Sequence, residues 1–590
     1  MLSKVVEVFK GEYSKKGDAM ILDSYIPADG TYVIVKPSDN GFYIDEKIDI
    51  KMDKKTKQID RMCSKYMKYI CLVDYYSKVT DMNKAILSSS GKVIQGNNYL
   101  SFIIKKESIT NGKLTEAIID EYYAKLRDPR TKYSTPEALQ LYDYAEKKVG
   151  QVDIDRLDKI QSWIKNNLFS EFKEYNGKDY LKIYFYYPED EYKKESERYY
   201  IPNIYNSNSY NITINGKIYG LHNNNMGLNA KKPYLENRTR KNSTPYLINQ
   251  EDVQLQKKFF DYLMNQANVG NVNIYINDKI VCISNKEFIK EEFSGIFIRI
   301  KKGKEVEIID FDTINNYNPK LKRMFEYKNI LGVDYDKLKV EYGNVRELES
   351  LQQIINEVIF SNILSGNYFT EPKDISIKDN ILVSNLLTAR TALFNWFYKG
   401  NMSSVWSVLQ KTSVNILKGS ILKGYKKASD QFNLIMSLKE YFEGGVGMAD
   451  IILQIKDDLR NKISEKETGA IESDRAYFFA VGQLVSFFIS RSKGKKKPLS
   501  LANPFINAKK DGVIKEKLKA LYKKYNYDIE SYNYKFKNLY AMAMSYEVNG
   551  KIKEDLIIAG YLHSNLLYES SKNNNEKESN EIIEEVDDNE

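Results

Sequence analysis

Two neighbouring carboxylates come nearest to a catalytic pattern in this chain. Asp310 and Asp312 stand in the stretch EVEIIDFDTI, where strand alternation places both side chains on one face. Such a pair could hold Mg²⁺ for phosphoryl-transfer chemistry. The stretch offers no third acidic ligand on that face, and two acids at a strand end are more often solvated or paired with lysines. We therefore expect that this protein is not an enzyme. The alternative is a metal-dependent nuclease that uses Asp310 and Asp312.

Other residue types that carry catalysis or bind cofactors are sparse. His222 could act as a general base, but a histidine in a polar loop more often hydrogen-bonds its own backbone. The glycine patterns GxxxxGK[ST] and GxGxxG are absent from the sequence, as is the GxSxG pattern of nucleophilic serines. Three cysteines without paired spacing and two histidines support neither a zinc site nor a disulfide framework. We predict no catalytic residue, no metal and no cofactor.

Residues 217–246, which we call the polar segment, carry the strongest functional signal. Their sequence is KIYGLHNNNMGLNAKKPYLENRTRKNSTPY, rich in asparagine and in lysine and arginine. Asparagine can make paired hydrogen bonds to base edges, and cations can neutralise phosphates. The alternative is an ordinary polar surface loop. The predicted nucleic-acid-binding residues are Asn223, Asn224, Asn225, Lys231, Lys232, Arg238, Arg240 and Lys241.

Ordered elements must hold this segment at both ends. Before it, the dipeptide Asn215-Gly216 stands between two alternating runs, which is the strongest short-range signal for a β-hairpin. After it, Asn249 precedes the helical pattern QEDVQLQKKFFDYLMNQA. We expect a loop held between a hairpin and a helix.

Two further stretches could contact nucleic acid. In GIFIRIKK, alternation places Phe297, Arg299 and Lys301 on one strand face, which suits base stacking and phosphate contact. A half-buried phenylalanine beside solvated charges is the alternative. The stretch RSKGKKKP, a predicted loop between helices, contains Lys495, Lys496 and Lys497, although such runs are usually only solvated.

Charge and hydropathy favour a polyanionic partner. The net charge is +9 even though the last twenty residues are strongly acidic, so the rest of the chain is more basic than this value. The abundance of Lys, Asn, Ile and Tyr could instead reflect an AT-rich genome. No apolar run is long enough for a membrane span and no signal peptide is recognisable. We expect a soluble, cytoplasmic protein.

The periodicity predicts an α+β protein, with a mixed α/β N-terminal region containing β-hairpins followed by an all-α C-terminal helical bundle. After Leu321 the strand signals stop. The predicted regions are a mixed α+β region at 1–179, a β-rich region at 180–320, a helical region at 321–442, a helical bundle at 448–570 and an acidic, disordered tail at 571–590.

Several segments together resemble one family. They are GLHNNNMGLNAKKPYLENRTRK, VDYYSKVTDMNKAI, NNYLSFIIKKES, ESDRAYFFAVGQLVSFFISRSKGKKKP, NLYAMAMSYE and EDLIIAGYL. In order and spacing they look like the large subunit of the type I-B CRISPR surveillance complex (Cascade), an antiviral ribonucleoprotein. The resemblance extends from near the N-terminus to about Tyr568.

The resemblance implies a non-catalytic subunit that contacts the guide-RNA end and reads the protospacer-adjacent motif on double-stranded target DNA. It also implies contact with the displaced strand, with backbone and small subunits, and with a separate helicase-nuclease. Sequence fidelity would come from guide pairing. Asn97 and Asn98, with Lys105 and Lys106, are a second candidate surface, and an ordinary strand or helix entry is the alternative. A general single-strand-binding protein is a further alternative.

The family also implies a C-terminal domain similar to the small subunit, which related systems make from an internal start. Glu443-Gly444-Gly445 can be encoded as GAAGGAGGN, which contains a ribosome-binding sequence shortly before Met448. We therefore hypothesise that residues from Met448 onward are also made as a separate helical protein. The alternative is that EGGVG is only an interdomain linker.

Overall fold

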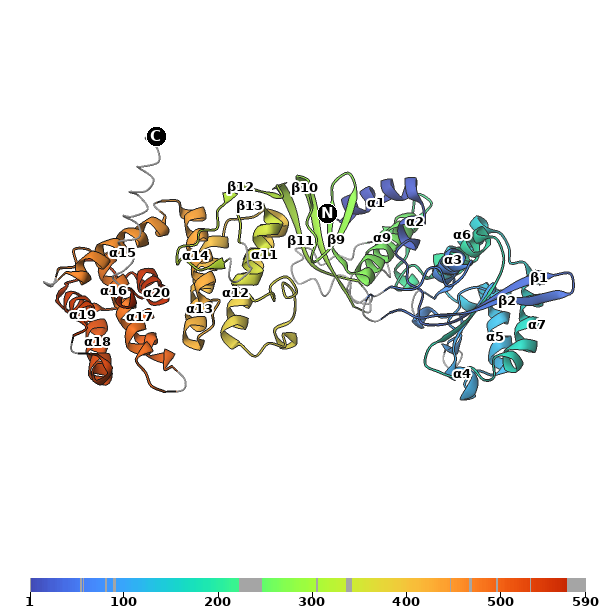
Figure 1. Ribbon diagram of the computed structural model, residues 1–590. Coiled ribbons are helices and arrows are strands. Elements are labelled where there is room, and N and C mark those ends of the chain that lie inside the picture. The colour runs from blue at the N-terminus through green and yellow to red at the C-terminus, as the bar shows by residue number, and fades with distance from the viewer. Residues whose placement is uncertain are drawn as a thin grey trace, which may run out of the picture. The chain divides into compact units, whose positions relative to one another are not determined.

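The computed structural model describes residues 2–53, 56, 58–79, 82–88, 92–221, 247–303, 306–335, 342–445, 447–465, 469–494, 497–530 and 532–569 (Figure 1). The chain forms two compact units. The N-terminal unit comprises Met1–Glu287 and Ser294–Asn315, and the C-terminal unit comprises Phe288–Phe293 and Asn316–Glu590. Each unit is described here by itself.

A four-stranded sheet with the order β2-β1-β4-β3 organises the first part of the N-terminal unit. Strands β1 and β4 run parallel, whereas β2 and β3 pair with them in the antiparallel direction. Both central strands are rich in β-branched and aromatic residues, as buried strands usually are. The strands are β1 (Gly30–Ser38), β2 (Gly41–Ile50), β3 (Ser101–Lys105) and β4 (Tyr180–Phe185).

Helices cover both faces of this sheet. On one face, Tyr184 of β4 packs against Tyr192 of α8, and on the other Phe185 packs against Trp163 of α7. Alternation along β4 sends these two side chains in opposite directions. The helices of this part are α3 (Met67–Ser77), α4 (Glu107–Thr110), α5 (Glu116–Arg127), α6 (Pro136–Val149), α7 (Ile154–Glu171) and α8 (Glu189–Tyr200).

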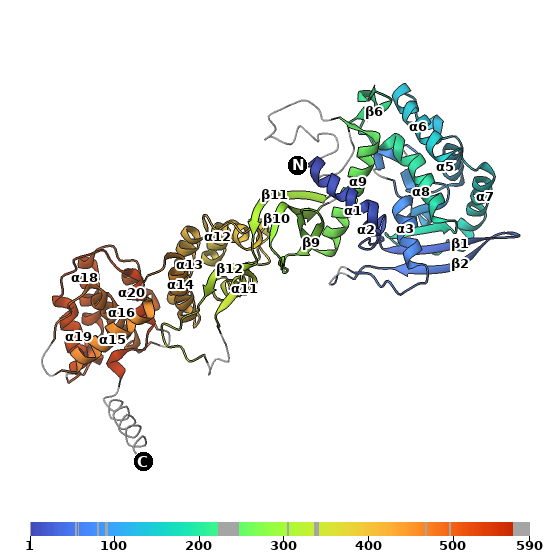
Figure 2. The same ribbon diagram turned by 90° about the horizontal axis from the view of Figure 1, so that it is seen from above.

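A second four-stranded sheet, with the order β11-β10-β8-β9, packs against two helices. Phe9 of α1 contacts Phe259 of α9, and both belong to a buried cluster with Ile274 and Ile298 of the sheet. Figure 2 shows α1 lying beside α9. The elements are α1 (Leu2–Lys16), α2 (Ala19–Leu22), α9 (Gln250–Val269), β8 (Asn271–Ile276), β9 (Ile280–Ser284), β10 (Phe293–Lys302) and β11 (Val306–Tyr317).

The predicted boundary at 180 is wrong, and so is the prediction that strand signals stop after Leu321. Residues 180–185 form β4 in the middle of the first sheet, so the chain does not begin a new region at 180. Strand signals also do not stop at Leu321, because β12 (Lys320–Phe325) pairs with β13 (Val345–Glu347). Only Phe325 of β12 is buried, so the alternation that marks a strand in a sequence is weak here.

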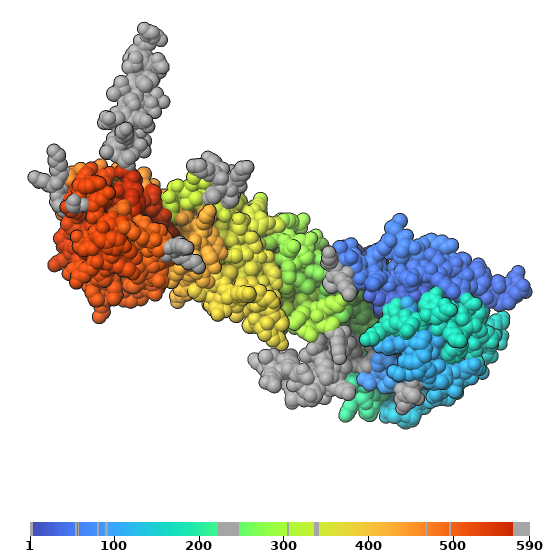
Figure 3. All heavy atoms as spheres, turned by 60° about the horizontal axis from the view of Figure 1, so that its bottom comes forward, coloured from blue at the N-terminus to red at the C-terminus, as the bar shows by residue number. Residues whose placement is uncertain are grey.

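Helices make up most of the C-terminal unit, and those from α15 to α20 form one continuous body in the space-filling view (orange to red in Figure 3). The helices of the unit are α11 (Leu348–Val358), α12 (Asn380–Lys399), α13 (Val405–Lys423), α14 (Ala428–Glu443), α15 (Met448–Ser464), α16 (Asp474–Ser490), α17 (Asn503–Ile506), α18 (Asp511–Tyr525), α19 (Tyr534–Ser545) and α20 (Glu554–Leu562).

Helix α16 is the centre of this helical body. Its sequence is apolar on all sides and nearly every residue from Ala476 to Ile489 is buried, as expected for a helix surrounded by others. Helix α20 approaches it very closely at Gly482 and Gly560. A Cβ on Gly482 would collide with the carbonyl oxygen of Ile557, and a Cβ on Gly560 would collide with that of Phe479. Only glycine permits this contact.

The α+β fold class is confirmed, with sheets in the N-terminal unit and helices in most of the C-terminal unit. Among the described residues, every helix is too short or too polar to cross a lipid bilayer. The predicted tail at 571–590 lies outside the described residues.

Candidate nucleic-acid interface

Most of the polar segment, residues 222–246, lies outside the described residues. This range includes His222 and the predicted contact residues Asn223, Asn224, Asn225, Lys231, Lys232, Arg238, Arg240 and Lys241. Their role stays a prediction. The structure does describe the chain on either side of this range.

A small antiparallel sheet joins the two ends of the segment. Strand β6 (Lys217–Gly220) enters it, and β7 (Ile248–Asn249) pairs with β6 on the way out. Strand β5 (Ile212–Ile214) completes the sheet through the predicted hairpin. Asn215 and Gly216 both have positive φ angles, 50° and 76°, as a two-residue turn of this kind requires. The prediction that ordered elements hold both ends is confirmed.

Buried polar contacts hold this small sheet in place. The Tyr205 hydroxyl lies 2.7 Å from the carbonyl oxygen of Ile218 on β6 and 2.9 Å from that of Ile248 on β7. The side-chain oxygen of Gln250 accepts a hydrogen bond from the Ile218 N–H at 2.8 Å. Since Tyr205 and Gln250 are buried, these contacts are shielded from water and hold the two strands together.

Close packing around Gly220 also constrains this small sheet. A Cβ at this position would lie 2.7 Å from the ring of Tyr205 and would collide with the side-chain oxygen of Asn211. Beneath it, Ile218 and Ile248 join a buried cluster with Leu141 and Val253. The strand that leads into the polar segment is therefore built into a core of its own.

Helix α9 begins directly after strand β7 of the small sheet. The side-chain oxygen of Asn249 accepts hydrogen bonds from the N–H groups of Glu251 and Asp252, which caps the helix that the sequence predicts after Asn249. Lys217, the only cation of the polar segment within the described residues, forms an ion pair with Glu251 at 3.1 Å. The segment thus leaves a rigid sheet and returns to a capped helix.

The predicted nucleic-acid-binding face of β10 is largely buried. Phe297 is fully buried and packs edge-on against Tyr275. Arg299 is 5% exposed and donates a hydrogen bond to Asn273 at 2.6 Å. The prediction that these two residues are presented for stacking and phosphate contact is wrong, because this face of the strand is covered. Lys301 is exposed.

The prediction that Asn97 and Asn98 form part of a second contact surface is also wrong. Asn97 and Asn98 are buried, and Asn97 donates to the carbonyl oxygens of Tyr76 and Lys78. Lys106 is nearly buried and forms an ion pair with Asp179 at 2.6 Å. These polar groups hold loops together inside the N-terminal unit. The adjacent Lys105 is partly exposed.

In the basic loop after α16, Lys495 and Lys496 lie outside the described residues. Lys497 donates hydrogen bonds to the carbonyl oxygens of Ser490 and Ser492, both at 2.7 Å. A lysine in this position satisfies carbonyls at the end of a helix. Lys497 therefore has structural partners of its own. Its contact with nucleic acid stays a prediction.

The two carboxylates of β11 differ in exposure, Asp312 being exposed and Asp310 half-buried. The Asp312 carboxylate accepts a hydrogen bond from the N–H of Thr313 at 2.9 Å. Within the described ranges, no group of three or more Asp, Glu, His or Cys side chains is arranged to hold a metal ion.

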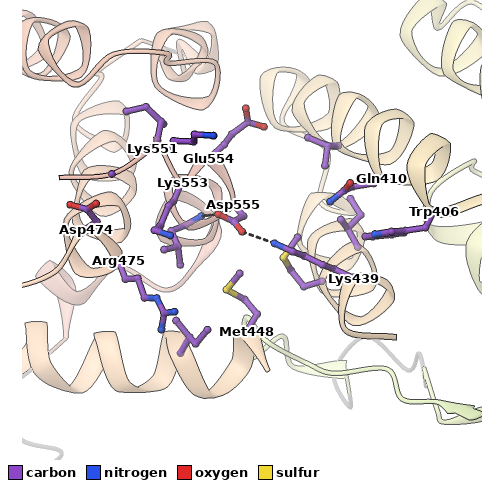
Figure 4. A pocket seen from close by; sticks show the side chains of 17 residues that line it. Trp406, Gln410, Lys439, Met448, Asp474, Arg475, Lys551, Lys553, Glu554 and Asp555 are labelled. Carbon is purple, nitrogen blue, oxygen red and sulfur yellow. Dashed lines mark hydrogen bonds and ion pairs between the residues drawn. The ribbon is translucent and has the colours of Figure 1, made fainter. Parts of the chain in front are cut away.

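A cavity of about 600 Å³ in the C-terminal unit brings together Met448 and a set of residues that the sequence does not single out (Figure 4). It lies between α13 and α14 on one side and the start of α16 and the stretch 550–556 on the other. The ion pair of Lys439 with Asp555 crosses it at 3.3 Å. Its polar and aromatic lining includes Trp406, Gln410, Lys439, Arg475, Lys551 and Lys553.

The lining combines an aromatic ring and cations with the carboxylates of Asp474, Glu554 and Asp555. Trp406 stacks on Phe442 and donates its indole N–H to Glu443, which fixes the orientation of its ring. Arg475 and Lys551 are exposed and form no ion pair with any described residue. An oriented aromatic ring beside uncommitted cations is a common arrangement for binding single strands. The sequence does not reveal this arrangement, because its residues come from four separate stretches, 406–414, 435–451, 474–475 and 550–556.

Comparison with known proteins adds no neighbour. No protein-family model matches the chain, and neither a curated protein nor a solved structure is significantly similar to it.

Proposed function

We propose that this chain is the non-catalytic large subunit of a type I-B CRISPR surveillance complex. Its partners would be a guide RNA, double-stranded target DNA, the backbone and small subunits, and a helicase-nuclease. The proposal rests on the ordered set of resembling segments, on the basic charge of the chain and on the polar segment. Sequence recognition would come from guide pairing, while the protein reads a short adjacent motif.

The observation that carries the proposal is that a small sheet joins the two ends of the polar segment and holds them in place. Two paired strands, the buried Tyr205 and the capped helix α9 fix both ends of an Asn-, Lys- and Arg-rich stretch. A recognition segment needs such support, because anchored ends lower the entropy lost on binding. In this role the asparagines would contact base edges and the cations would contact phosphates.

The test is binding of the reconstituted complex, with its guide RNA, to duplexes that differ only in the flanking motif. We expect Asn224→Ala or Asn225→Ala to cost about 1 to 3 kcal/mol on the preferred motif and much less on other motifs. Asn166→Ala, at an exposed position on α7, is the control. Equal losses on all motifs would contradict base reading. Mg²⁺-dependent cleavage that disappears in Asp310→Ala would overturn the non-catalytic role.

The C-terminal helices are proposed to be made separately as well, beginning at Met448. Support comes from the position of this methionine as the first residue of α15 and from the well-buried α16 that the later helices surround. With an antibody against residues 571–590, we expect a full-length band and a short band. Met448→Leu preserves side-chain volume, so the full-length chain should fold while the short band disappears. A persisting short band would refute this start site.

A further inference from the structure

A second cavity, of about 300 Å³, lies inside the N-terminal unit. It is formed by the end of α1, the end of α3, and the facing sides of α8 and α9. The volume is at the lower end of the range for small-molecule sites. Its charged lining residues are Asp18, Lys78, Lys193, Glu197, Lys257 and Lys258.

Most of these charges already have partners. Lys193 and Lys258 both contact Asp18, at 3.2 Å and 3.4 Å. Lys257 forms an ion pair with Asp261, which lies one turn further along α9. These pairs leave the lining with a surplus of positive charge.

The remaining two charged residues, Glu197 and Lys78, differ in whether they have an ionic partner. Glu197 forms an ion pair with Lys148 at 3.0 Å. Lys78 has neither a hydrogen bond nor an ion pair from its ammonium group to any described residue, and its nearest recorded contact is the face of the Tyr25 ring at 4.4 Å. Lys78 is therefore the uncommitted cation of the cavity.

Lys78 lines the cavity and is exposed as a residue, but protein atoms crowd its ammonium group. This loss of bulk water lowers the pKa of Lys78 to about 8, an effect that Asp74 of α3 opposes and Lys182 of β4 reinforces. On α9, Asp261 and Lys257 act on it with opposite signs. A bound anion would restore the stabilisation that the ammonium group lacks.

We propose that this cavity binds a phosphate group of a mononucleotide-sized ligand, with the phosphate beside Lys78. A phosphate monoester carries a charge of about −1.5 to −2 at pH 7, which suits a small cavity whose four lining lysines outnumber its two lining acids. The phosphate could belong to a free nucleotide or to the end of a strand. The proposal does not rest on the function proposed above.

Calorimetric titration of the purified full-length chain, without guide RNA, tests the proposal. AMP and inorganic phosphate are expected to bind and adenosine is not. Lys78→Met should weaken AMP binding about tenfold or more, whereas Lys78→Arg should retain most of it. Lys68→Met, at an exposed position on helix α3, which ends just before Lys78, is the matched control and should bind like the parent. Short RNAs with a 5′-phosphate or a 5′-hydroxyl distinguish the two sources.

The pH dependence separates a direct contact from a structural effect. The second ionisation of a phosphate monoester is complete above pH 7, since its pKa is about 6. Affinity for AMP should therefore fall about tenfold between pH 7 and 9 as Lys78 loses its proton, and the Lys78→Met variant should show no such fall. Absence of AMP binding, or equal binding by the parent and a folded Lys78→Met variant, would overturn the proposal. Neither result would affect motif recognition by the assembled complex.

Discussion

Replacing Asp74 by alanine is expected to destabilise the N-terminal unit by about 3 to 5 kcal/mol. Asp74 is fully buried and forms an ion pair with the buried Lys182 at 2.5 Å. Its carboxylate also accepts hydrogen bonds from the hydroxyls of Tyr25 and Tyr184, at 2.5 Å and 2.6 Å. Alanine would leave the Lys182 ammonium group buried without its partner, and the cost of that uncompensated charge dominates the effect.

Urea unfolding of the full chain, followed by hydrogen exchange, measures this loss. Protection of peptides from α3 and β4 should fall, while peptides from α16 in the other unit should be unchanged and act as an internal control. Glu121→Ala, at an exposed position on α5, should change stability by less than about 0.5 kcal/mol. The double variant Asp74→Leu/Lys182→Met should be more stable than Asp74→Ala, because it removes both charges. A loss under about 1 kcal/mol in Asp74→Ala would contradict the role of the pair.

The same pair has a defined acid dependence. Burial alone would raise the pKa of Asp74, but the charges of Lys182 and Lys78, with hydrogen bonds from Lys182 and Tyr184, lower it from 3.8 to about 2. A lowered folded-state pKa contributes stability above the unfolded-state pKa and loses it as the pH falls through the folded value. The difference in unfolding free energy between the parent and Asp74→Asn should therefore shrink as the pH falls from about 4 to about 2.

Elements with strong local patterns could be predicted from sequence. The Asn215-Gly216 turn, the alternation of β10 and the capped helix α9 each depend on residues that lie close together in the chain. Pairing between distant segments could not be predicted in this way. Strand β4 lies beside β1 although well over a hundred residues separate them, and no local signal near residue 180 marks that partner.

Burial decided which predicted contact residues stay available. Alternation correctly separates the two faces of β10, but it does not show that packing also covers the face with Phe297 and Arg299. The same holds for Asn97 and Asn98, whose amides look like recognition groups in sequence but satisfy buried backbone carbonyls or neighbouring side chains. The cavity beside Trp406 shows the reverse case, since its cations acquire a shared position only in the folded unit.

Removing three cations of the polar segment, in the variant Arg238→Ala/Arg240→Ala/Lys241→Ala, is expected to weaken DNA binding by the assembled complex by about 10²- to 10³-fold at 100 mM salt. Each phosphate contact releases counterions from DNA, so the plot of log affinity against log salt should become shallower by about 2 to 3. Filter binding or fluorescence anisotropy between 50 and 300 mM salt measures both quantities. Because phosphates carry no sequence information, the loss should be similar on all flanking motifs.

A matched variant separates contact from overall charge. Lys147→Ala/Lys159→Ala/Lys173→Ala removes the same number of charges from exposed positions of the N-terminal unit. If the segment touches phosphates, only its own variant should change the salt dependence strongly, because charges separated from DNA by more than about 10 Å are screened at 100 mM salt. Equal, small losses in both variants would reduce the polar segment to an ordinary surface loop. A loss confined to one flanking motif would instead mean that the arginines read base edges.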